Sequence, residues 1–241
     1  MKILGIIPAR YGSTRFEGKP LALINGKMMI QRVYEQACKA DRLSEVVVAT
    51  DDERIYNAVL GFGGKAVMTS TNHKSGTDRC REVVDKVGAG FEAVINIQGD
   101  EPYINPLQIN QIAELISDKD TPIASLCKPV HDAEELASPN AVKVVFDKNG
   151  KALYFSRFAI PYLRNKVERT FYKHIGIYAY KTLTLREISA LPQSGLELAE
   201  SLEQLRWLEN GYTVRMGVTE FESFSVDVPE DITKIESIFK E

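Results

Sequence analysis

Three cationic side chains lie close together near the start of the chain, in a loop that also contains two glycines. The loop covers residues 8–20 and carries Arg10, Arg15 and Lys19. Arginine and lysine neutralise phosphate charge, and small residues let backbone N–H groups approach an anion closely. The loop therefore predicts a phosphate-binding site; the alternative is a solvated basic loop. It matches neither GxGxxG nor GxxxxGK[ST], so it is neither a dinucleotide fingerprint nor a P-loop.

Two aspartates at distant positions have the chemistry to hold a metal ion beside such a site. Asp100 lies in the turn Gly99–Pro102 after an apolar run, and Asp227 lies just before Pro229. Carboxylates together with substrate phosphates are ligands that Mg²⁺ prefers. We predict Asp227 at the end of a short strand, followed by a helix that starts near Pro229. In the alternative interpretation, both are ordinary turn or helix-capping acids.

Further polar groups occur in the middle and the second half of the chain. The run Ser75–Arg79 opens a predicted helix, where its backbone donors would bind a base or ribose, or only cap the helix. His174 and Tyr178 share one face of a predicted strand because side chains alternate there, although a lone histidine is more often structural. Arg157 follows another apolar strand. The spacing predicts that one helix face carries Glu200, Glu203, Gln204 and Trp207. The alternative interpretation is a solvated acidic stripe.

Strands and helices that alternate along the first half must position these residues. Short β-branched runs predict strands at 3–7, 45–50 and 92–98, with helical periodicity between and after them. Near-continuous apolar strands predict a Rossmann-like, mostly parallel sheet with helices on both faces. Ligands bind such sheets at the carboxyl ends of the strands. The basic loop and Asp100 are therefore expected at the same edge.

The second half predicts an antiparallel insertion. Residues 141–146 and 151–155 predict a hairpin around Asn149-Gly150, residues 172–180 predict a strand, and the leucines from Leu198 to Leu208 predict one helix. No low-complexity linker separates the halves. We therefore expect a single domain over 1–241, with an antiparallel and helical subregion at about 140–215.

The composition limits the classes of function. The chain has 241 residues, 44% of them hydrophobic, and a formal net charge of −3. These values fit an extended core and lack the basic excess of nucleic-acid-binding proteins. Three cysteines without a CxxC pair fit free thiols in a reducing compartment. The apolar run at the N-terminus is too short for a signal peptide or a membrane span. We expect a soluble cytoplasmic protein with no nucleic-acid partner and no membrane insertion.

Taken together, blocks along nearly the whole chain resemble the 3-deoxy-manno-octulosonate cytidylyltransferase family. The blocks that carry the resemblance are Ile7–Tyr11 with Ser13–Arg15, Gly18–Leu21, Ser75–Arg79, Gln98–Pro102, Asn140–Val145, Ala152–Arg157, His174–Tyr178, Leu202–Arg206, and Val226–Asp227 with Pro229–Asp231.

The resemblance implies a fold of the nucleotide-diphospho-sugar transferase type and one reaction. CTP and 3-deoxy-manno-octulosonate (Kdo) would give CMP-Kdo and pyrophosphate, for lipopolysaccharide biosynthesis. The anomeric hydroxyl would attack the α-phosphorus in line, so positioning and charge neutralisation would carry the catalysis. The family also implies Mg²⁺ as cofactor, a homodimer, and a role in sugar binding and dimerisation for the subregion at about 140–215.

The resemblance also implies roles for individual residues. Catalysis would fall to Arg10, Lys19, Asp100 and Asp227, of which Asp100 and Asp227 would bind the metal. Nucleotide binding is implied for Ala9, Arg10, Ser13, Arg15, Lys19, Ser75, Gly76, Thr77, Arg79 and Gln98. Sugar binding is implied for Gln98, Arg157, His174, Tyr178, Glu203 and Gln204. Arg157 suits the sugar carboxylate because its planar fork matches a carboxylate.

Two positions depart from the family pattern. Glu17 stands where relatives usually have proline, and a carboxylate there repels a triphosphate unless it points away or pairs with a cation. Val228 stands where they usually have threonine, which removes a hydroxyl beside the predicted metal ligand Asp227.

Three other functions remain as alternatives. A cytidylyltransferase for sialic acid would share the opening loop, but Arg157 and the blocks near His174 and Glu203 favour Kdo. A glycosyltransferase on a similar sheet usually needs a DxD-like pair, which Asp100-Glu101 does not match. A non-catalytic nucleotide-binding module would be favoured by loss of Lys19 or either aspartate, and all three are present.

Overall fold

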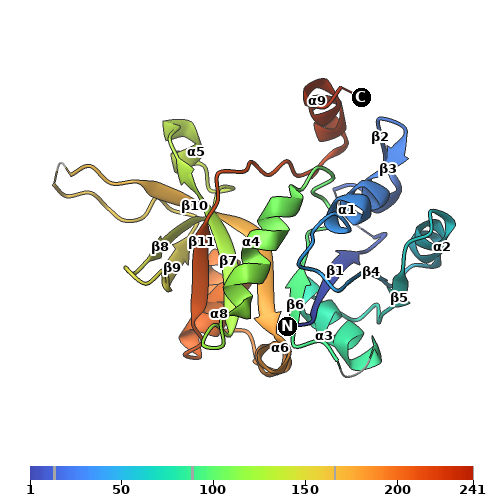
Figure 1. The fold of residues 1–241 in the computed structure, drawn as a ribbon. Coiled ribbons are helices and arrows are strands. Elements are labelled where there is room, and N and C mark those ends of the chain that lie inside the picture. The colour runs from blue at the N-terminus through green and yellow to red at the C-terminus, as the bar shows by residue number, and fades with distance from the viewer. Residues whose placement is uncertain (13–14, 88–89, 166, 241) are drawn as a thin grey trace. The chain divides into compact units, whose positions relative to one another are not determined.

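The computed structural model describes residues 1–12, 15–87, 90–165 and 167–240, and its tertiary contacts divide them into two units. The first unit comprises residues 1–113 and the chain from Ser223 onward, and the second comprises Glu114–Glu222 (Figure 1). The predicted subregion at about 140–215 lies within the second unit.

Four parallel strands form the sheet of the first unit, in the order β6-β1-β4-β5. In its register, Gly5 lies between Val46 and Ile95. The three strands predicted in this half are confirmed, and β5 is an addition that the sequence analysis did not predict. The strands are β1 (Ile3–Ala9), β4 (Glu45–Thr50), β5 (Ala66–Met68) and β6 (Ala93–Asn96).

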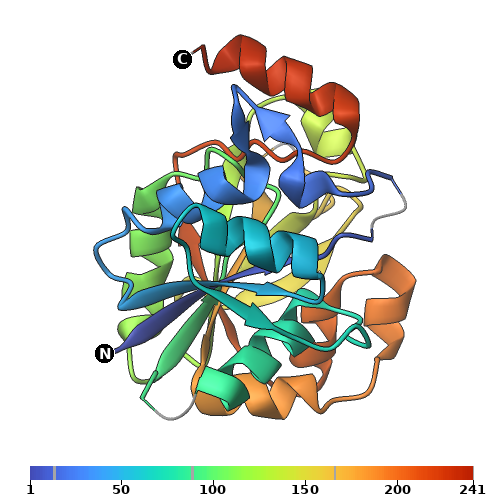
Figure 2. The ribbon, with the colours of Figure 1, turned by 90° about the vertical axis from the view of Figure 1, so that its right-hand side faces the viewer.

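Helices cover both faces of this sheet, as predicted. Helices α1 (Met29–Ala37) and α2 (Glu53–Gly61) lie on one face, and α3 (Gly76–Val87) lies on the other (Figure 2). Helix α2 begins after Asp52, whose carboxylate accepts a hydrogen bond from Arg54 N at 2.9 Å. A short 3₁₀ helix, η1 (Lys19–Leu21), and the strands β2 (Leu23–Ile24) and β3 (Lys27–Met28) precede α1.

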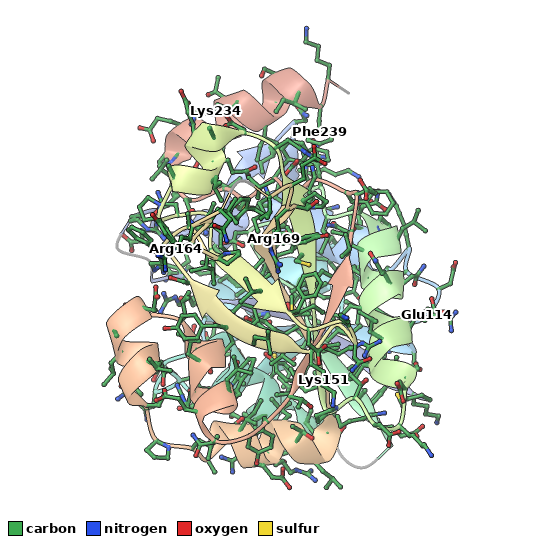
Figure 3. All side chains as sticks on the ribbon, turned by 90° about the vertical axis from the view of Figure 1, so that its left-hand side faces the viewer. Glu114, Lys151, Arg164, Arg169, Lys234 and Phe239 are labelled. Atoms are coloured by element: carbon green, nitrogen blue, oxygen red, sulfur yellow. The ribbon has the colours of Figure 1, made fainter. Side chains whose placement is uncertain are left out.

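The C-terminal helix α9 (Pro229–Ile238) returns to the first unit and packs beside β2. Figure 3 shows Lys234 on this helix and Phe239 just after it. A small core of Ile24, Met29, Val226 and Ile235 holds the helix in place, with aromatic residues around it. The helix predicted from Pro229 is confirmed.

The short strand predicted before α9 is wrong. Residues 219–228 form neither strand nor helix. The backbone around Val226 is held instead by individual contacts, since Val226 N donates to Asp100 O at 2.9 Å and Val226 O accepts from the Lys19 ammonium at 2.8 Å. These two contacts give the backbone N–H and carbonyl of Val226 their hydrogen-bond partners, which in a strand would come from a neighbouring strand.

Helix α4 (Pro106–Ser117) leads into the second unit, which contains the predicted antiparallel part. Strand β7 (Ile123–Val130) pairs with β11 (Val214–Val218) in parallel and with β10 (Phe171–Lys181) in antiparallel orientation. The predicted hairpin is confirmed as β8 (Lys143–Phe146) and β9 (Ala152–Ser156). Figure 3 shows Lys151 at the start of its second strand, and Arg164 and Arg169 in the segment before β10. A short helix, α5 (Ala133–Ala137), follows β7.

The single helix predicted over the leucines from Leu198 to Leu208 is wrong. The structure has two helices there, α7 (Gly195–Glu200) and α8 (Glu203–Glu209), after α6 (Thr182–Ser189). Ser201 has a left-handed backbone with φ 52°, which ends α7 and turns the chain. Leu198 is therefore exposed, whereas Leu202 and Leu205 are buried. Glu200 consequently lies on a different helix from Glu203, Gln204 and Trp207.

No helix in the described part of the chain is both long enough and apolar enough to cross a membrane.

Gly99 is one of the positions where this packing leaves least room for a side chain. A Cβ there would lie 2.6 Å from the Pro8 carbonyl oxygen, which belongs to the rigid strand β1. We expect Gly99→Ala to lower the free energy of unfolding by about 1–3 kcal/mol, because the turn after β6 must shift. Urea denaturation measures this, with Gly61→Ala as control because a Cβ there has no atom within 4 Å. Equal stability of the two variants would contradict the steric explanation.

Candidate functional site

A pocket of about 280 Å³ lies in the first unit, next to the carboxyl ends of β1 and β6. Its lining comes from the segments after β1, before and within α3, after β6, and before α9. The described residues that line it are Pro8, Ala9, Arg10, Arg15, Lys19, Pro20, His73, Lys74, Ser75, Gly76, Arg79, Gln98, Gly99, Asp100 and Asp227. Because β1 and β6 are parallel neighbours, their following loops reach the same edge.

The charge of this pocket is strongly positive. Its described lining contains five Arg or Lys side chains and two carboxylates, which gives a net charge of +3 with His73 neutral. Cations clustered at a sheet edge beside the start of a helix attract phosphate groups. The arrangement therefore suits a polyanionic ligand.

Lys19 connects three parts of the pocket. Its ammonium donates to Asp100 Oδ2 and to the Val226 carbonyl, both at 2.8 Å. Gly18 sets the direction of this lysine: its φ of 69° is left-handed, and its N–H donates to Tyr11 O at 2.9 Å. The two segments that carry the predicted metal ligands are thus held by one side chain of the predicted phosphate loop.

Asp227 is held by its neighbours in the chain and by one arginine. Val226 before it is fully buried, so the backbone is anchored while the aspartate side chain remains about half exposed. Its carboxylate pairs with Arg15 at 3.1 Å. Its backbone N–H and that of Val228 donate to Asp231 Oδ2 at 3.0 and 3.2 Å, so Asp231 supplies the acceptor for this turn. Asp227 is not the N-cap of α9, because that position belongs to Val228.

The run Ser75–Arg79 opens α3 as predicted, and two of its residues have structural partners. Ser75 Oγ accepts from Asp78 N at 3.1 Å, which is helix capping. Arg79 lines the pocket but is buried, where its guanidinium donates to Asp51 Oδ2 at 2.7 Å and to Thr69 Oγ1. Gly76 lets the helix approach β6, since a Cβ there would lie 3.2 Å from Asn96 Nδ2. Thr77 is buried and does not line the pocket.

The pocket therefore brings together most residues predicted for nucleotide, metal and catalytic roles. Ser13 lies outside the described residues. The sequence analysis missed two polar lining residues, His73 and Lys74. They directly precede Ser75 in the same polar turn, so their position was the available signal. His73 Nε2 is hydrogen-bonded to Glu82, whose pKa is lowered to about 2 by contacts with Lys86, Ser70 N and His73 that outweigh its partial burial.

Glu17 is exposed and does not line the pocket. Its charge acts on Arg54, whose pKa is raised mainly by the hydrogen bond to Asp52 and further by Tyr11 and Glu17. The carboxylate therefore has a cation near it, and the pocket keeps its positive charge.

Arg157, in the second unit, is held tightly by backbone oxygens. Its guanidinium donates to the carbonyls of Glu200 at 2.8 Å, Pro139 at 2.9 Å and Ser201 at 3.4 Å. An arginine has five N–H donors, so these bonds use three of them. In the described part of the chain, one N–H on each terminal nitrogen has no protein acceptor. The side chain thus caps the end of α7 and keeps donors for an anion.

His174 and Tyr178 lie side by side on β10, as the alternation predicted, with ring centroids 5.1 Å apart. Burial lowers the pKa of His174 to about 3, so this histidine is neutral near pH 7. Ser125 Oγ lies 2.9 Å from His174 Nε2 and 2.8 Å from Ile177 O. Because the hydroxyl has one hydrogen, which it donates to Ile177 O, it accepts from Nε2–H and leaves Nδ1 as an acceptor.

Three further sugar-binding candidates, Tyr178, Glu203 and Gln204, lie in the second unit. Burial raises the pKa of Tyr178 well above its ordinary value, and its buried hydroxyl has no hydrogen-bond partner among the described residues. Gln204 is buried in α8, and the charge of Glu203 also raises the pKa of Tyr178. Tyr178 contacts the edge of the Trp207 ring, with centroids 5.1 Å apart. Gln98 lies in the first unit and lines the pocket there.

The pKa of His174 gives stability a specific dependence on pH. The unfolded histidine, with a pKa near 6.5, binds a proton as the pH falls below that value, whereas the folded one does so only near 3. Stability from this residue is therefore full above pH 6.5 and falls as the pH falls toward 3. Between pH 7 and 5 we expect wild type to lose about 2 kcal/mol more stability than His174→Gln. Urea denaturation at both pH values measures this, and parallel losses would contradict it.

Comparison with known proteins identifies the family of this chain. Residues 4–232 match the family model described as cytidylyltransferase. A 3-deoxy-manno-octulosonate cytidylyltransferase of Parabacteroides distasonis is 57% identical, over 97% of this chain and 96% of its own length. Another of that name, from Bacteroides thetaiotaomicron, is 55% identical over 100% of this chain and 99% of its own.

Solved structures give the same result. The structure of CMP:2-keto-3-deoxy-manno-octonic acid synthetase complexed with CTP matches with a TM-score of 0.94 at 45% identity, over 99% of this chain and 98% of that chain. A cytidylyltransferase from Leptospira borgpetersenii has the same fold at 14% identity, with a TM-score of 0.65 over 100% of this chain and 89% of its own. The predicted Rossmann-like fold of the nucleotide-diphospho-sugar transferase type is confirmed. The chain belongs to the cytidylyltransferase family and, within it, to the 3-deoxy-manno-octulosonate cytidylyltransferases.

Proposed function

We propose that this protein transfers the cytidylyl group of CTP to Kdo and releases pyrophosphate. The observation that carries the proposal is the positive pocket at the carboxyl ends of β1 and β6, whose lining includes five cationic side chains together with Asp100 and Asp227. The relatives named for this reaction support the choice of substrates. The product would serve lipopolysaccharide synthesis.

In this reaction the sugar hydroxyl attacks the α-phosphorus in line, and the bond to the β-phosphate breaks. The work of the protein is to hold the triphosphate and to stabilise the charge that develops on the leaving pyrophosphate. Arg10, Arg15 and Lys19 are the groups for this, because they come from one loop and face one pocket. Ser75 and Gly76, at the start of α3, and Ala9, at the end of β1, are placed to offer backbone groups to the nucleotide.

We propose Mg²⁺ as the cofactor, held by Asp100 and Asp227 together with the nucleotide. The fit is chemical: both carboxylates line the same pocket, and Mg²⁺ in phosphoryl-transfer sites takes one or two carboxylates, substrate phosphates and water. Among the described residues, no group of three or more His, Cys, Asp or Glu side chains is placed to hold a metal alone. When bound, Mg²⁺ would neutralise phosphate charge and orient the α-phosphate.

We assign sugar recognition to residues of the second unit. Arg157 offers two N–H groups to the sugar carboxylate, a geometry that matches its two oxygens. His174 is neutral and offers Nδ1 as an acceptor for a sugar hydroxyl. Tyr178, Glu203 and Gln204 supply further hydrogen-bonding groups.

Pyrophosphate release from CTP and Mg²⁺, with Kdo present or absent, tests the function directly. We expect release that depends on Kdo and does not occur with sialic acid. Release with sialic acid but not with Kdo would identify another sugar acid as the substrate. CTP binding without release under any condition would favour a nucleotide-binding module.

Loss of the Lys19 ammonium should remove most of the activity. We expect Lys19→Met to lower kcat/KM for CTP by about 10²–10³-fold, as removal of one preorganised donor to a developing oxyanion does. Lys39→Met is the matched control, because Lys39 is an exposed lysine that donates only to Gln36 in the described structure. Thermal unfolding of both variants shows whether the fold is kept. A Lys19 variant with the kcat/KM of wild type would contradict its role.

Loss of the Asp227 charge should weaken metal binding without unfolding the protein. Its ion pair with Arg15 is exposed, so the pair contributes only about 0–1 kcal/mol to stability. We expect Asp227→Asn to weaken binding of Mn²⁺, used as a spectroscopic substitute for Mg²⁺, by about tenfold or more in the presence of CTP. Electron paramagnetic resonance of free Mn²⁺ measures this, with the exposed Glu230→Gln as control. Equal Mn²⁺ affinity of both variants would remove Asp227 from the metal site.

A further inference from the structure

One lysine in the second unit has no exposed surface. Lys143 begins β8 and lies opposite Ser156 of β9. Its ammonium donates to Ser138 O at 2.7 Å and to Arg157 O at 2.6 Å. Lysine is almost never fully buried, and replacing a buried charge by an apolar side chain of similar volume is often neutral for stability. Stability alone therefore gives little reason for a charge at this position.

Lys143 is connected to Arg157 in two ways. Lys143 fixes the Arg157 carbonyl directly. It also fixes Ser138, the residue before Pro139, and the Pro139 carbonyl accepts from the Arg157 guanidinium. One buried ammonium thus holds both the backbone of Arg157 and the turn on which its side chain rests.

Glu200 completes the arrangement from the end of α7. Its carboxylate accepts from Arg157 N at 2.9 Å and from Ser156 Oγ at 2.6 Å, and its carbonyl accepts from Arg157 Nε at 2.8 Å. Lys143 therefore holds the backbone carbonyl of Arg157, and Glu200 holds its backbone N–H. Such fixation of backbone and side chain preorganises a planar donor for a planar ligand.

The charges of these three residues leave an excess of one positive charge. The single carboxylate of Glu200 balances only one of the two cations. The desolvation of Lys143 lowers its pKa, the charge of Arg157 lowers it further and the charge of Glu200 raises it, so both charges act on Lys143. An anion bound on the two remaining N–H groups of Arg157 would neutralise the excess.

We propose that Lys143 and Glu200 are positioning residues for Arg157, and that they fix its guanidinium for the carboxylate of the sugar acid. This inference rests on the proposed function. Neither residue touches the substrate: each acts through the backbone or the guanidinium of Arg157.

A double-mutant cycle on the KM for Kdo tests the inference. We expect Lys143→Met to raise this KM by about tenfold or more, because a displaced guanidinium no longer matches the carboxylate. The KM for CTP should remain near that of wild type. In an Arg157→Ala background the same substitution should have little further effect, because the residue through which it acts is gone. Equal increases of KM in both backgrounds, or equal effects on Kdo and CTP, would show a merely structural role and overturn the inference.

Control variants separate the possible causes. Lys128→Met removes a partly buried lysine of the same unit, one that pairs with Glu222, and should keep both KM values. If Lys143→Met does not fold, Glu200→Gln enters the same cycle, with the same outcomes for and against. A wild-type enzyme without Kdo-dependent pyrophosphate release would overturn the proposed function and this inference together. An active wild type with an unchanged KM in the folded variant would overturn the inference alone.

Discussion

The ion pair between Lys19 and Asp100 is the contact on which the geometry of the pocket depends. The ammonium lies 2.8 Å from both Asp100 Oδ2 and the Val226 carbonyl, and Val226 N donates back to Asp100 O. The loop after β1, the turn after β6 and the segment before α9 are thereby joined through three hydrogen bonds. These segments are about 80 and 130 residues apart in the chain, so no local rule of helix or strand formation places them together. The buried core around Val226 fixes the third segment from the other side.

This arrangement pairs each carboxylate proposed for the metal with a cation proposed for the phosphates: Lys19 with Asp100, and Arg15 with Asp227. A triphosphate that drew Lys19 away would leave the Asp100 carboxylate facing another anion, at a cost of about 1–4 kcal/mol for charges 4 Å apart near a protein surface. A divalent cation that took up the carboxylates alone would leave the two cations unpaired. When nucleotide and metal bind together, the two carboxylates would face the metal and the two cations would face the phosphates. The proposed binding of the two is therefore mutually favourable, and the charge pairs of the structure are its physical origin.

The sequence predicted the elements of the first unit because their apolar periodicity is strong and their strands are buried on both faces. It also predicted which loops lie together, since a parallel sheet brings the ends of its strands to one edge. It failed where a single residue or a distant contact decides the local structure. Ser201 breaks the predicted helix by adopting a left-handed backbone, which the leucine spacing does not reveal. Val226 was predicted in a short strand that ends at Asp227, but its backbone bonds go to Asp100 and Lys19. The pairing of Lys19 with Asp100, and the network of Lys143 and Glu200 around Arg157, depend on tertiary contacts that spacing does not encode.

The two units offer different chemistry to a ligand. The pocket of the first unit carries a net positive charge, which suits a polyphosphate. Among the sugar-binding candidates of the second unit, Tyr178 and Gln204 are buried, His174 is neutral, and burial keeps the phenol of Tyr178 protonated. A buried hydroxyl without a partner, such as that of Tyr178, destabilises the protein by about 1–3 kcal/mol until a ligand supplies the missing hydrogen bond. Sites built in this way discriminate strongly against ligands that lack the matching group. If these residues bind the sugar as proposed, selection among sugar acids should depend on the hydroxyl positions that neutral groups contact, while Arg157 would pair with the carboxylate.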